Sequence, residues 1–269
     1  MPYTPLQLAN AFIQAGELDD ALAALDEHLI AEPEDDVVRR MRASVLLRLA
    51  SAEHLNRALT DLQQLGDTTS DDWQQQSIIY EKLGDLKNAI SRMQQAIALQ
   101  PNHERYAERL LQLYIANNNL EAALELVRQQ ARTWRWLQWE GDILVLLGDD
   151  MMATARYGLV LALLNELADS AHIAAIRGRI LLARAACYMR LGYGDVAREH
   201  FLAAQKIYPN DPTIEFNLGV LHFLDGEREV AIDQCRRAYQ DANAALQGQM
   251  RLTLAEHAIT AAFLDEGSA

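Results

Sequence analysis

Residues 80–101 read YEKLGDLKNAISRMQQAIALQP, and residues 188–209 read YMRLGYGDVAREHFLAAQKIYP. Both stretches carry a tyrosine, a glycine, an alanine, a bulky apolar residue, a second alanine and a proline at the same intervals. These residues are Tyr80, Gly84, Ala89, Met93, Ala96 and Pro101 in the first stretch, and Tyr188, Gly192, Ala197, Phe201, Ala204 and Pro209 in the second. Their separation of 108 positions is close to three units of about 34 residues plus a short insertion. One structural unit is therefore used repeatedly along the chain.

Each interval of this unit has a physical reason. Gly84 and Gly192 are expected in a tight turn between two helices, because glycine adopts a left-handed backbone at little cost. The alanine five residues later is small because two antiparallel helices cross there closely, and the bulky residue one turn further on fills the space between helices. The proline ends the second helix, because its ring cannot continue the hydrogen-bond ladder.

The same spacing recurs elsewhere and predicts seven helix-turn-helix units. Further copies have their turns at Gly16, Asn118, Gly148 and Gly226. The remaining unit, which contains Leu46 and Ala58, fits only if its internal turn, Ala50 to Asn56, is about three residues longer. The units are expected at about residues 2–35, 36–69, 70–103, 104–137, 134–167, 178–211 and 212–245, followed by a capping helix and a frayed terminus over 246–269.

The pattern resembles that of the tetratricopeptide repeat family, whose units are helix-turn-helix hairpins of about 34 residues. The resemblance covers about residues 2–245 and includes Leu218-Gly219, which matches the family's Leu-Gly pair, with Gly141 and Ala185 as matching small residues. It implies an all-α fold, a right-handed α-solenoid (superhelix) of about seven such hairpins. A C-terminal capping helix is expected because the last hairpin must cover its apolar face.

The chain departs from a regular array in several places. Extra residues between Asn165 and Gly178 are expected to lengthen the first helix of the sixth unit. Around Thr133 the spacing tightens to about 30 residues, which predicts a bent junction. After the repeats, residues 249–265 read as one further helix, and residues 266–269 are expected to fray.

Composition restricts the classes of function. The formal net charge is −14, so the surface repels phosphate backbones and nucleic acid is not an expected partner. No apolar run is long enough to span a bilayer, and the first twenty residues lack the cationic start of a secretory signal. Cys187 and Cys235 are isolated thiols that fit small core positions in the reduced state. We therefore expect no membrane association and a cytoplasmic location.

A search for chemistry finds no site motif. The seven histidines are scattered and form neither a His-Glu-x-x-His pair nor a Cys/His cluster with metal spacing. The sequence also has no phosphate-binding glycine loop and no Gly-x-Ser-x-Gly elbow. We expect no catalytic residue, no metal and no cofactor.

The resemblance places the candidate binding residues on the first helix of each hairpin. In the family this helix lines a concave groove that binds extended peptides or short helices of other proteins. Carried over unit by unit, the groove contains Asn10, Gln74, Lys82, Arg105, Glu108, Gln112, Arg135, Gln138, Asp142, Arg179, Met189 and Arg190.

The arginines of this set concentrate in the second half of an acidic chain. One hypothesis is that they bind carboxylates of a partner segment, each charge-assisted hydrogen bond contributing about 1.5–3 kcal/mol when desolvated. The alternative is that they pair with acids of the chain itself, such as Glu108 and Asp142, and contribute little net energy. The carboxylate clamp of the family's chaperone-tail binders is disfavoured, because Leu6 stands where the clamp has a lysine beside Asn10.

Two groups of apolar residues each allow two structural interpretations. Trp134, Trp136 and Trp139 either fill an irregular helix junction, which we favour, or form an aromatic anchor for a ligand. The other group comprises Phe216, Val220, Phe223 and Leu224. These residues would leave a large apolar patch in the groove, so either the C-terminal helix covers them, which we favour, or a second subunit does. The chain is then a monomer or a homodimer through its C-terminal apolar face.

The sequence predicts a non-catalytic scaffold or adaptor that binds a peptide or helical segment of a partner protein in its concave groove, and the arginine hypothesis makes that segment acidic. The alternative is a ligand sensor or enzyme with a pocket at the bend near Trp136 and Arg179. RNA binding by a related helical repeat is opposed by the negative charge.

Overall fold

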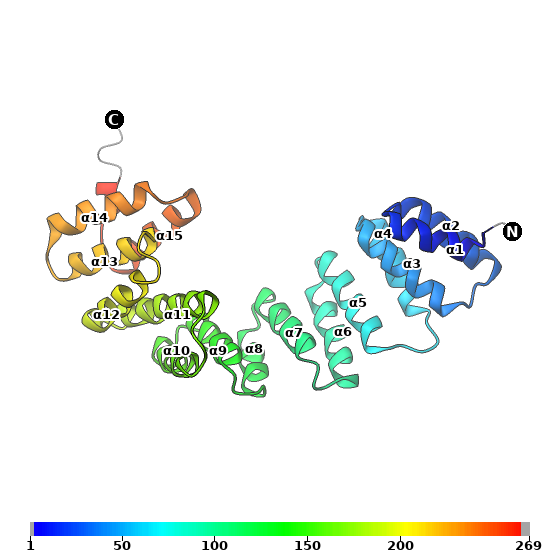
Figure 1. Ribbon diagram of the computed structural model, residues 1–269, viewed down its shortest axis with the longest axis horizontal. Helices are drawn as coiled ribbons and strands as arrows, with labels where there is room; N and C mark the ends of the chain where they lie inside the picture. The colour runs from blue at the N-terminus through cyan, green and yellow to red at the C-terminus, as the bar shows by residue number, and fades with distance from the viewer. Residues whose placement is uncertain (1–2, 265–269) are drawn as a thin grey trace. The chain divides into compact units, whose positions relative to one another are not determined.

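The computed structural model describes residues 3–264, which fold into helices joined by short turns, without a strand among them (Figure 1). The helices are α1 (Pro5–Ala15), α2 (Leu18–Ala31), α3 (Asp36–Leu49), α4 (Ala52–Gln63), α5 (Ser70–Lys82), α6 (Leu86–Leu99), α7 (Glu104–Ala116), α8 (Leu120–Arg128), α9 (Trp134–Leu146), α10 (Asp150–Asn165), α11 (Ala171–Arg190), α12 (Gly194–Gln205), α13 (Pro212–Leu224), α14 (Arg228–Gln240), α15 (Ala244–Glu256) and the short 3₁₀ helix η1 (Ala261–Leu264). The predicted all-α helical-repeat fold is confirmed.

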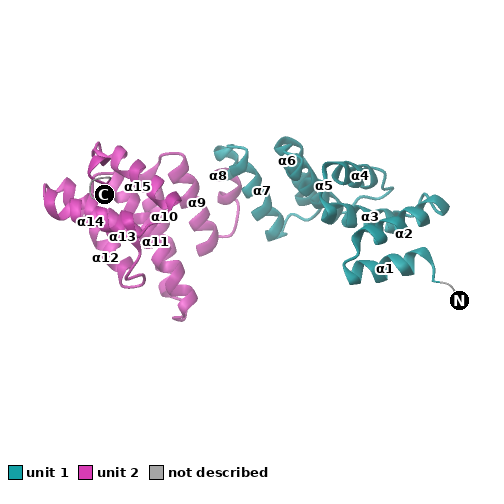
Figure 2. Ribbon diagram, turned by 90° about the horizontal axis from the view of Figure 1, so that it is seen from above, with its two compact units in different colours: residues 1–123 teal, residues 124–269 magenta. Residues whose placement is uncertain are grey.

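The chain divides into two compact units, unit 1 over Met1–Ala123 and unit 2 over Leu124–Ala269 (Figure 2). In unit 1, α1 packs on α2, α3 on α4, and α5 on α6. In unit 2, α9 packs on α10, α11 on α12, and α13 on α14. Helices α7 and α8 follow one another with the same kind of turn, so the described residues contain seven successive helix pairs before α15.

The turn inside each hairpin has the left-handed geometry expected from the sequence. The backbone angle φ is positive at Gly16, Gly84, Asn118, Gly148, Gly192 and Gly226. The residue after the turn then donates its amide hydrogen to the carbonyl oxygen of the aromatic or apolar residue four positions before the turn, as in Asp85 N to Tyr80 O and Tyr193 N to Tyr188 O, both 2.9 Å. This is the Schellman arrangement, which satisfies carbonyls that the ended helix leaves without a partner.

The crossing of the two helices is close because small residues lie on both sides. The alanines five positions after the turn, Ala21, Ala89, Ala123, Ala153, Ala197 and Ala231, are fully buried. On the first helix the facing position is also small: a Cβ atom added at Gly141 would lie 2.6 Å from the Tyr157 ring, and one added at Gly219 would lie 2.6 Å from Cys235 Sγ. The predicted small-residue crossing is therefore confirmed.

The prediction of a longer turn in the second hairpin is wrong. Helix α4 already begins at Ala52, and Ser51 caps it by accepting a hydrogen bond from the His54 amide. Ala50 takes the left-handed turn position with φ 56°, which glycine or asparagine occupies in the other hairpins. The buried residue five positions later is Leu55 instead of alanine, which is why the spacing could not be matched from the sequence.

Both predicted departures from regular spacing are present. Helix α11 spans 20 residues, longer than the other first helices, and begins with a Ser170 cap. Helix α9 begins at Trp134, 30 positions after the start of α7 at Glu104, so residues 134–137 belong to the fifth helix pair. No helix of the described part is both long and apolar enough to cross a membrane.

The C-terminal segment differs from the predicted single helix over 249–265. Helix α15 starts at Ala244, where Asn243 caps it, and ends at Glu256; Ala258 then adopts a left-handed conformation before η1. Met250, Leu254, Phe263 and Leu264 join the core formed by α11, α12, α13 and α14. The predicted fraying of residues 266–269 lies outside the described residues.

Two glycine substitutions test the crossing geometry in opposite directions. Gly219→Ala should destabilise unit 2 by about 1–3 kcal/mol, because the new methyl group meets Cys235 Sγ and the Cys235 amide nitrogen at 3.2 Å. Gly248→Ala in α15 meets no atom within 4 Å and should stabilise the helix by roughly 0.5–1 kcal/mol. Chemical denaturation of both variants provides the measurement, and a neutral Gly219→Ala would refute the close crossing.

Candidate functional site

The predicted groove residues of unit 1 lie on α1, α5 and α7. Lys82, Arg105 and Gln112 are exposed, whereas Gln74 and Glu108 are half-buried. Asn10 is exposed and donates from its amide to Leu6 O of its own helix at 2.9 Å. Gln112 accepts a hydrogen bond from Arg109, which also pairs with Glu81 of α5. The first helices α5 and α7 thus share a polar network on this side of unit 1.

In unit 2 the structure brings three of the predicted residues together. Asp142 of α9 accepts a hydrogen bond from the Tyr157 hydroxyl at 2.7 Å. Burial raises the pKa of Asp142, and hydrogen bonds from Tyr157 and Gln138, together with the charge of Arg179 on α11, offset only part of this rise. Asp142 therefore ties α9 to α10 and is not simply a solvated groove carboxylate. Arg179 is exposed, and so is Arg135, which lies 5.7 Å from the Trp134 ring.

The tryptophan cluster lies in the packing of α9. Trp136 is 3% exposed, and Trp134 packs against the core of α9, α10 and α11. Neither Trp136 nor Arg179 lines the two cavities described below, one between α11, α13 and α15 and one beside Arg39, Arg42 and Arg57. This geometry agrees with the packing interpretation of the tryptophans.

Beside this cluster, one buried carboxylate holds three arginines, a feature the sequence reading missed. Glu140 is 1% exposed and lies within 3.1 Å of Arg128 Nε, 3.4 Å of Arg132 Nη1 and 2.9 Å of Arg156 Nε. Burial raises the pKa of Glu140, but the hydrogen bonds from Arg156 and Arg128 outweigh burial, so the net pKa lies below the ordinary value. The group joins α8, α9, α10 and the loop between α8 and α9. An acid four residues after a buried tryptophan was the available sequence signal.

Arg190 forms an ion pair with an acidic residue of the chain itself. Its guanidinium donates to both oxygens of Asp150, at 2.9 and 2.6 Å. Burial raises the pKa of Asp150, but hydrogen bonds from Arg190 and Cys187 bring it below its ordinary value. For this arginine the structure supports the alternative in which groove arginines pair with acids of the chain.

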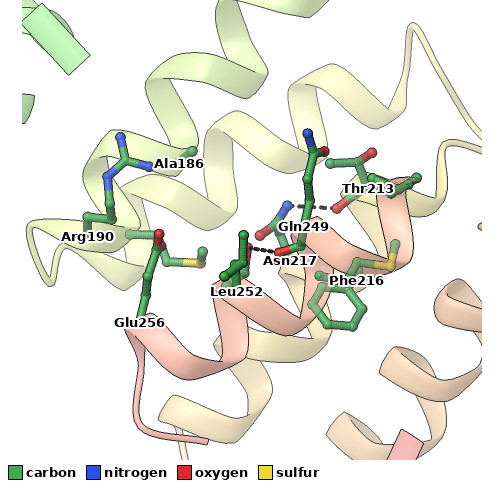
Figure 3. Close-up of a pocket in the computed structure, with 12 residues that line it drawn as sticks. Ala186, Arg190, Thr213, Phe216, Asn217, Gln249, Leu252 and Glu256 are labelled. Carbon is green, nitrogen blue, oxygen red and sulfur yellow. Dashed lines mark hydrogen bonds between the residues drawn. The ribbon is translucent and has the colours of Figure 1, made fainter. Parts of the chain in front are cut away.

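A cavity of about 310 Å³ lies between α11, α13 and α15 (Figure 3). Its lining consists of Ala186, Met189, Arg190, Thr213, Phe216, Asn217, Leu246, Gln249, Met250, Leu252, Thr253 and Glu256. Two walls are first helices of hairpins, and each contributes residues spaced three and four apart, which is one face of a helix. The Asn217 amide donates to Thr213 O at 2.8 Å, as Figure 3 shows. The cavity therefore lies on the side that the resemblance assigns to the groove.

One predicted groove residue is almost fully buried. Met189 is only 4% exposed, because it packs in the core with residues of α11, α12 and α13, and it also lines the cavity. Phe216 and Val220 are also fully buried, and the Phe223 ring lies 5.2 Å from that of Phe263. The chain's own C-terminal segment covers this apolar face, whereas Leu224 remains 49% exposed.

Two further clusters lie in unit 1. His28, Glu32 and Asp35 bring ligand atoms within 4.8 Å of one another, with His28 Nε2 3.0 Å from Asp35 Oδ2. Asp35 at the same time caps α3 through the amides of Val37 and Val38, so capping and an ion pair account for the cluster. A second cavity, beside Arg39, Arg42 and Arg57, has these cations paired with Asp36, Asp61 and Asp26.

A family model described as tetratricopeptide repeat matches residues 75–134 and 182–246. These segments contain the two stretches with identical spacing, and the turns, crossings and helix pairs around them have the geometry described above. Residues 75–134 and 182–246 thus match the tetratricopeptide repeat family in sequence, and the helix pairs around them have the geometry of its repeats. No curated protein matches its sequence.

Solved structures support the same fold. The C-terminal part of a tetratricopeptide repeat-containing protein from Cytophaga hutchinsonii matches with a TM-score of 0.62 at 13% identity, over 96% of this chain and 97% of that chain. MamA matches with a TM-score of 0.52 at 18% identity, over 62% of this chain and 96% of that chain. YrrB, described as a tetratricopeptide repeat protein with an unusual peptide-binding site, gives 0.50 at 17% identity, over 74% and 99%. At these identities the likeness concerns the fold alone.

Substituting the buried carboxylate should give a pH-dependent loss of stability. Glu140→Gln should destabilise unit 2 by about 1–3 kcal/mol at neutral pH, because it removes the charge that holds Arg156, Arg128 and Arg132. The folded-state pKa of Glu140 is lowered, so its contribution is present above the ordinary glutamate pKa and disappears as pH falls through the folded-state value.

Chemical denaturation over a pH series checks this, with the exposed Glu125→Gln on α8 as the matched control. The gap between Glu140→Gln and the unmodified chain should close in acid, and Glu125→Gln should show little effect at any pH. A gap that is constant across the series would mean that the charge of Glu140 does not contribute to stability.

Proposed function

We propose that this tetratricopeptide repeat protein is a non-catalytic scaffold that binds a peptide or helical segment of a partner protein on the face formed by the first helices of its hairpins. The tetratricopeptide fold is typical of protein–protein interaction scaffolds. The observation that carries the proposal is the cavity between α11, α13 and α15, since two first helices form its walls. Its volume of about 310 Å³ suits a few side chains of a bound segment.

The chemistry of the cavity suits recognition. On the first helices its lining includes the apolar residues Phe216 and Met189, and the amide group of Asn217 stands beside them. Apolar contact area with adaptable amide hydrogen bonding is the combination that binds a peptide side chain together with its backbone. Helices that are already ordered lose little entropy on binding.

The same cavity offers no arrangement for acid–base or nucleophilic catalysis. Arg190 and Glu256 are the charged residues of its lining, and Arg190 is held by Asp150. The Thr253 hydroxyl donates to the carbonyl of Gln249 at 3.2 Å within its own helix. No group in the lining is thus poised as a base beside a nucleophile, which supports binding over catalysis.

We propose in addition that the bound partner segment is acidic. Arg179 on α11 and Arg135 on α9 are exposed cations on first helices of unit 2. Replacing both by alanine should weaken partner binding and flatten its salt dependence, because rim charges act mainly through long-range attraction. Unchanged affinity in the double variant would mean that these two arginines do not contribute to partner binding, which would then depend on shape and apolar contact.

We propose further that the chain acts as a monomer in the cytoplasm, without nucleic acid or membrane as partner. Its apolar C-terminal face is covered by α15 and η1, which supports a monomer over a homodimer through that face. Cys187 and Cys235 are buried free thiols, which suits a reducing compartment. The net charge of −14 supports a partner other than nucleic acid.

Photo-crosslinking in cells of origin tests the binding face. Benzoylphenylalanine in place of Arg179 or Asn217 reports on contacts of first helices. The same group in place of Leu159 on α10 or Leu202 on α12, each 44% exposed, reports on contacts of second helices. We expect a discrete protein adduct from the first two positions and none above background from the others. Mass spectrometry of the adduct should map to one contiguous segment of the partner.

Adducts of equal yield from Leu159 and Leu202, or from these alone, would contradict the proposed face. A parallel thermal-shift screen with metabolites tests the ligand-sensor alternative. A saturable shift with a small molecule, in the absence of any protein adduct, would favour that alternative over the scaffold.

A further inference from the structure

Helix α15 lies against the face on which we propose that a partner binds. It faces Ala186, Met189 and Arg190 of α11 and Thr213, Phe216 and Asn217 of α13 across the cavity (Figure 3). The short helix η1, which follows α15, packs on α14. Helix α15 thus does more than extend the row of hairpins, because it covers the first-helix face of the sixth and seventh hairpins.

The face that α15 presents has the pattern of a bound amphipathic helix. Leu246, Met250 and Thr253 follow one another at intervals of four and three, and Gln249 and Glu256 lie four residues before and three residues after Thr253, so the five share one side of the helix. Leu246 and Met250 supply the apolar part, and Glu256 lies at the Arg190 end of the cavity. The hydrogen bond that Arg190 donates to Asp150 is the largest cause of the raised pKa of Arg190, and the charges of Asp150 and Glu256 add to it.

The contact between α15 and this face is incompletely filled. A cavity of about 310 Å³ that is partly open to solvent remains between α15 and this face. Of the residues of α15, only Met250 and Leu254 are buried, and Leu252 is 65% exposed. Met250 and Leu254 are therefore the two side chains whose burial holds α15 in place.

Hydrogen bonds attach α15 to α14 on the side away from the cavity-facing contact. Gln247 donates to Tyr239 O at 2.9 Å, and Arg251 donates to the Tyr239 hydroxyl at 2.9 Å. Beyond the end of α15, Arg236 donates to Phe263 O at 3.0 Å. These contacts hold both ends of the segment on α14 and leave the cavity-facing side as the replaceable contact.

We propose that α15 is a built-in competitor for this surface, and that the partner segment is an amphipathic helix with the pattern of α15: two large apolar residues one turn apart, followed by a carboxylate that faces Arg190. This inference rests on the proposed function and names the occupant of its binding face. Partner binding then requires displacement of α15, so the observed affinity is reduced by the fraction of molecules in which the surface is covered.

A labelled peptide with the sequence of residues 243–258, NAALQGQMRLTLAEHA, is the probe, titrated by fluorescence anisotropy against the full chain. Glu256→Arg in the chain places a like charge opposite Arg190 and should loosen α15 without touching the core, since Glu256 is exposed. This variant should bind the peptide at least tenfold more tightly than the unmodified chain. Glu229→Arg, an exposed charge reversal on α14, is the matched control and should bind as the unmodified chain does.

A second pair of variants removes packing instead of charge. Met250→Ala should tighten peptide binding and speed amide exchange in α15 while α13 stays protected. Met93→Ala truncates an equally buried methionine in unit 1 and should do neither. Binding no tighter for Glu256→Arg and Met250→Ala than for their controls would overturn the proposal, as would loss of protection in α13 together with α15.

The outcome is separable from that of the scaffold proposal. Protein adducts at Asn217 combined with failure of the peptide experiment would leave the binding face in place and reject α15 as its competitor. A dimer that forms by exchange of α15 between two Glu256→Arg chains would identify a second copy as the occupant, and would also overturn the partner-helix proposal.

Discussion

The close crossing of two helices within each hairpin is the constraint on which the rest of the structure depends. It requires a left-handed residue in the turn, a buried alanine five positions later and a small residue on the facing helix, as at Gly192, Ala197 and Ala185. With these met, the bulky side chains one turn further on are buried, and Phe201 packs in the same core as Ile214 and Leu218 of the next hairpin. First helices are thereby aligned on one side within each unit.

The features that suggest a function arise where this regular pattern is interrupted. The long helix α11 supplies Ala186, Met189 and Arg190, and the chain beyond α14 turns back so that α15 faces them across α13. The buried Glu140 with its three arginines holds the tightened junction between α8 and α9. Irregular elements therefore shape the candidate site, whereas the repeats supply a rigid support.

Much of the fold was accessible from the sequence, because glycine, alanine and proline act through local backbone and steric effects. Asn118 was correctly expected in a left-handed turn, since asparagine tolerates that geometry. Ala50 in the same role was missed because alanine carries no such signal, and this error displaced the predicted turn of the second hairpin. The break at Ala258 was missed for the same reason.

The candidate site was less accessible, because its residues meet only through tertiary packing. The sequence placed Met189 and Arg190 on the correct helix but gave no sign that one is buried in the core and the other is paired with Asp150. The contribution of α15 depends on the direction in which the chain leaves α14. Contacts of Tyr239 near the end of α14 and of Phe263 in η1 set this direction.

Hydrogen–deuterium exchange of the full chain, free and bound to the crosslinked partner, tests the central claim most directly. The account predicts new protection in α11 and α13 on partner binding, with faster exchange in α15 as it is displaced. Protection confined to the second helices α10, α12 and α14, with α11 and α13 unchanged, would contradict it.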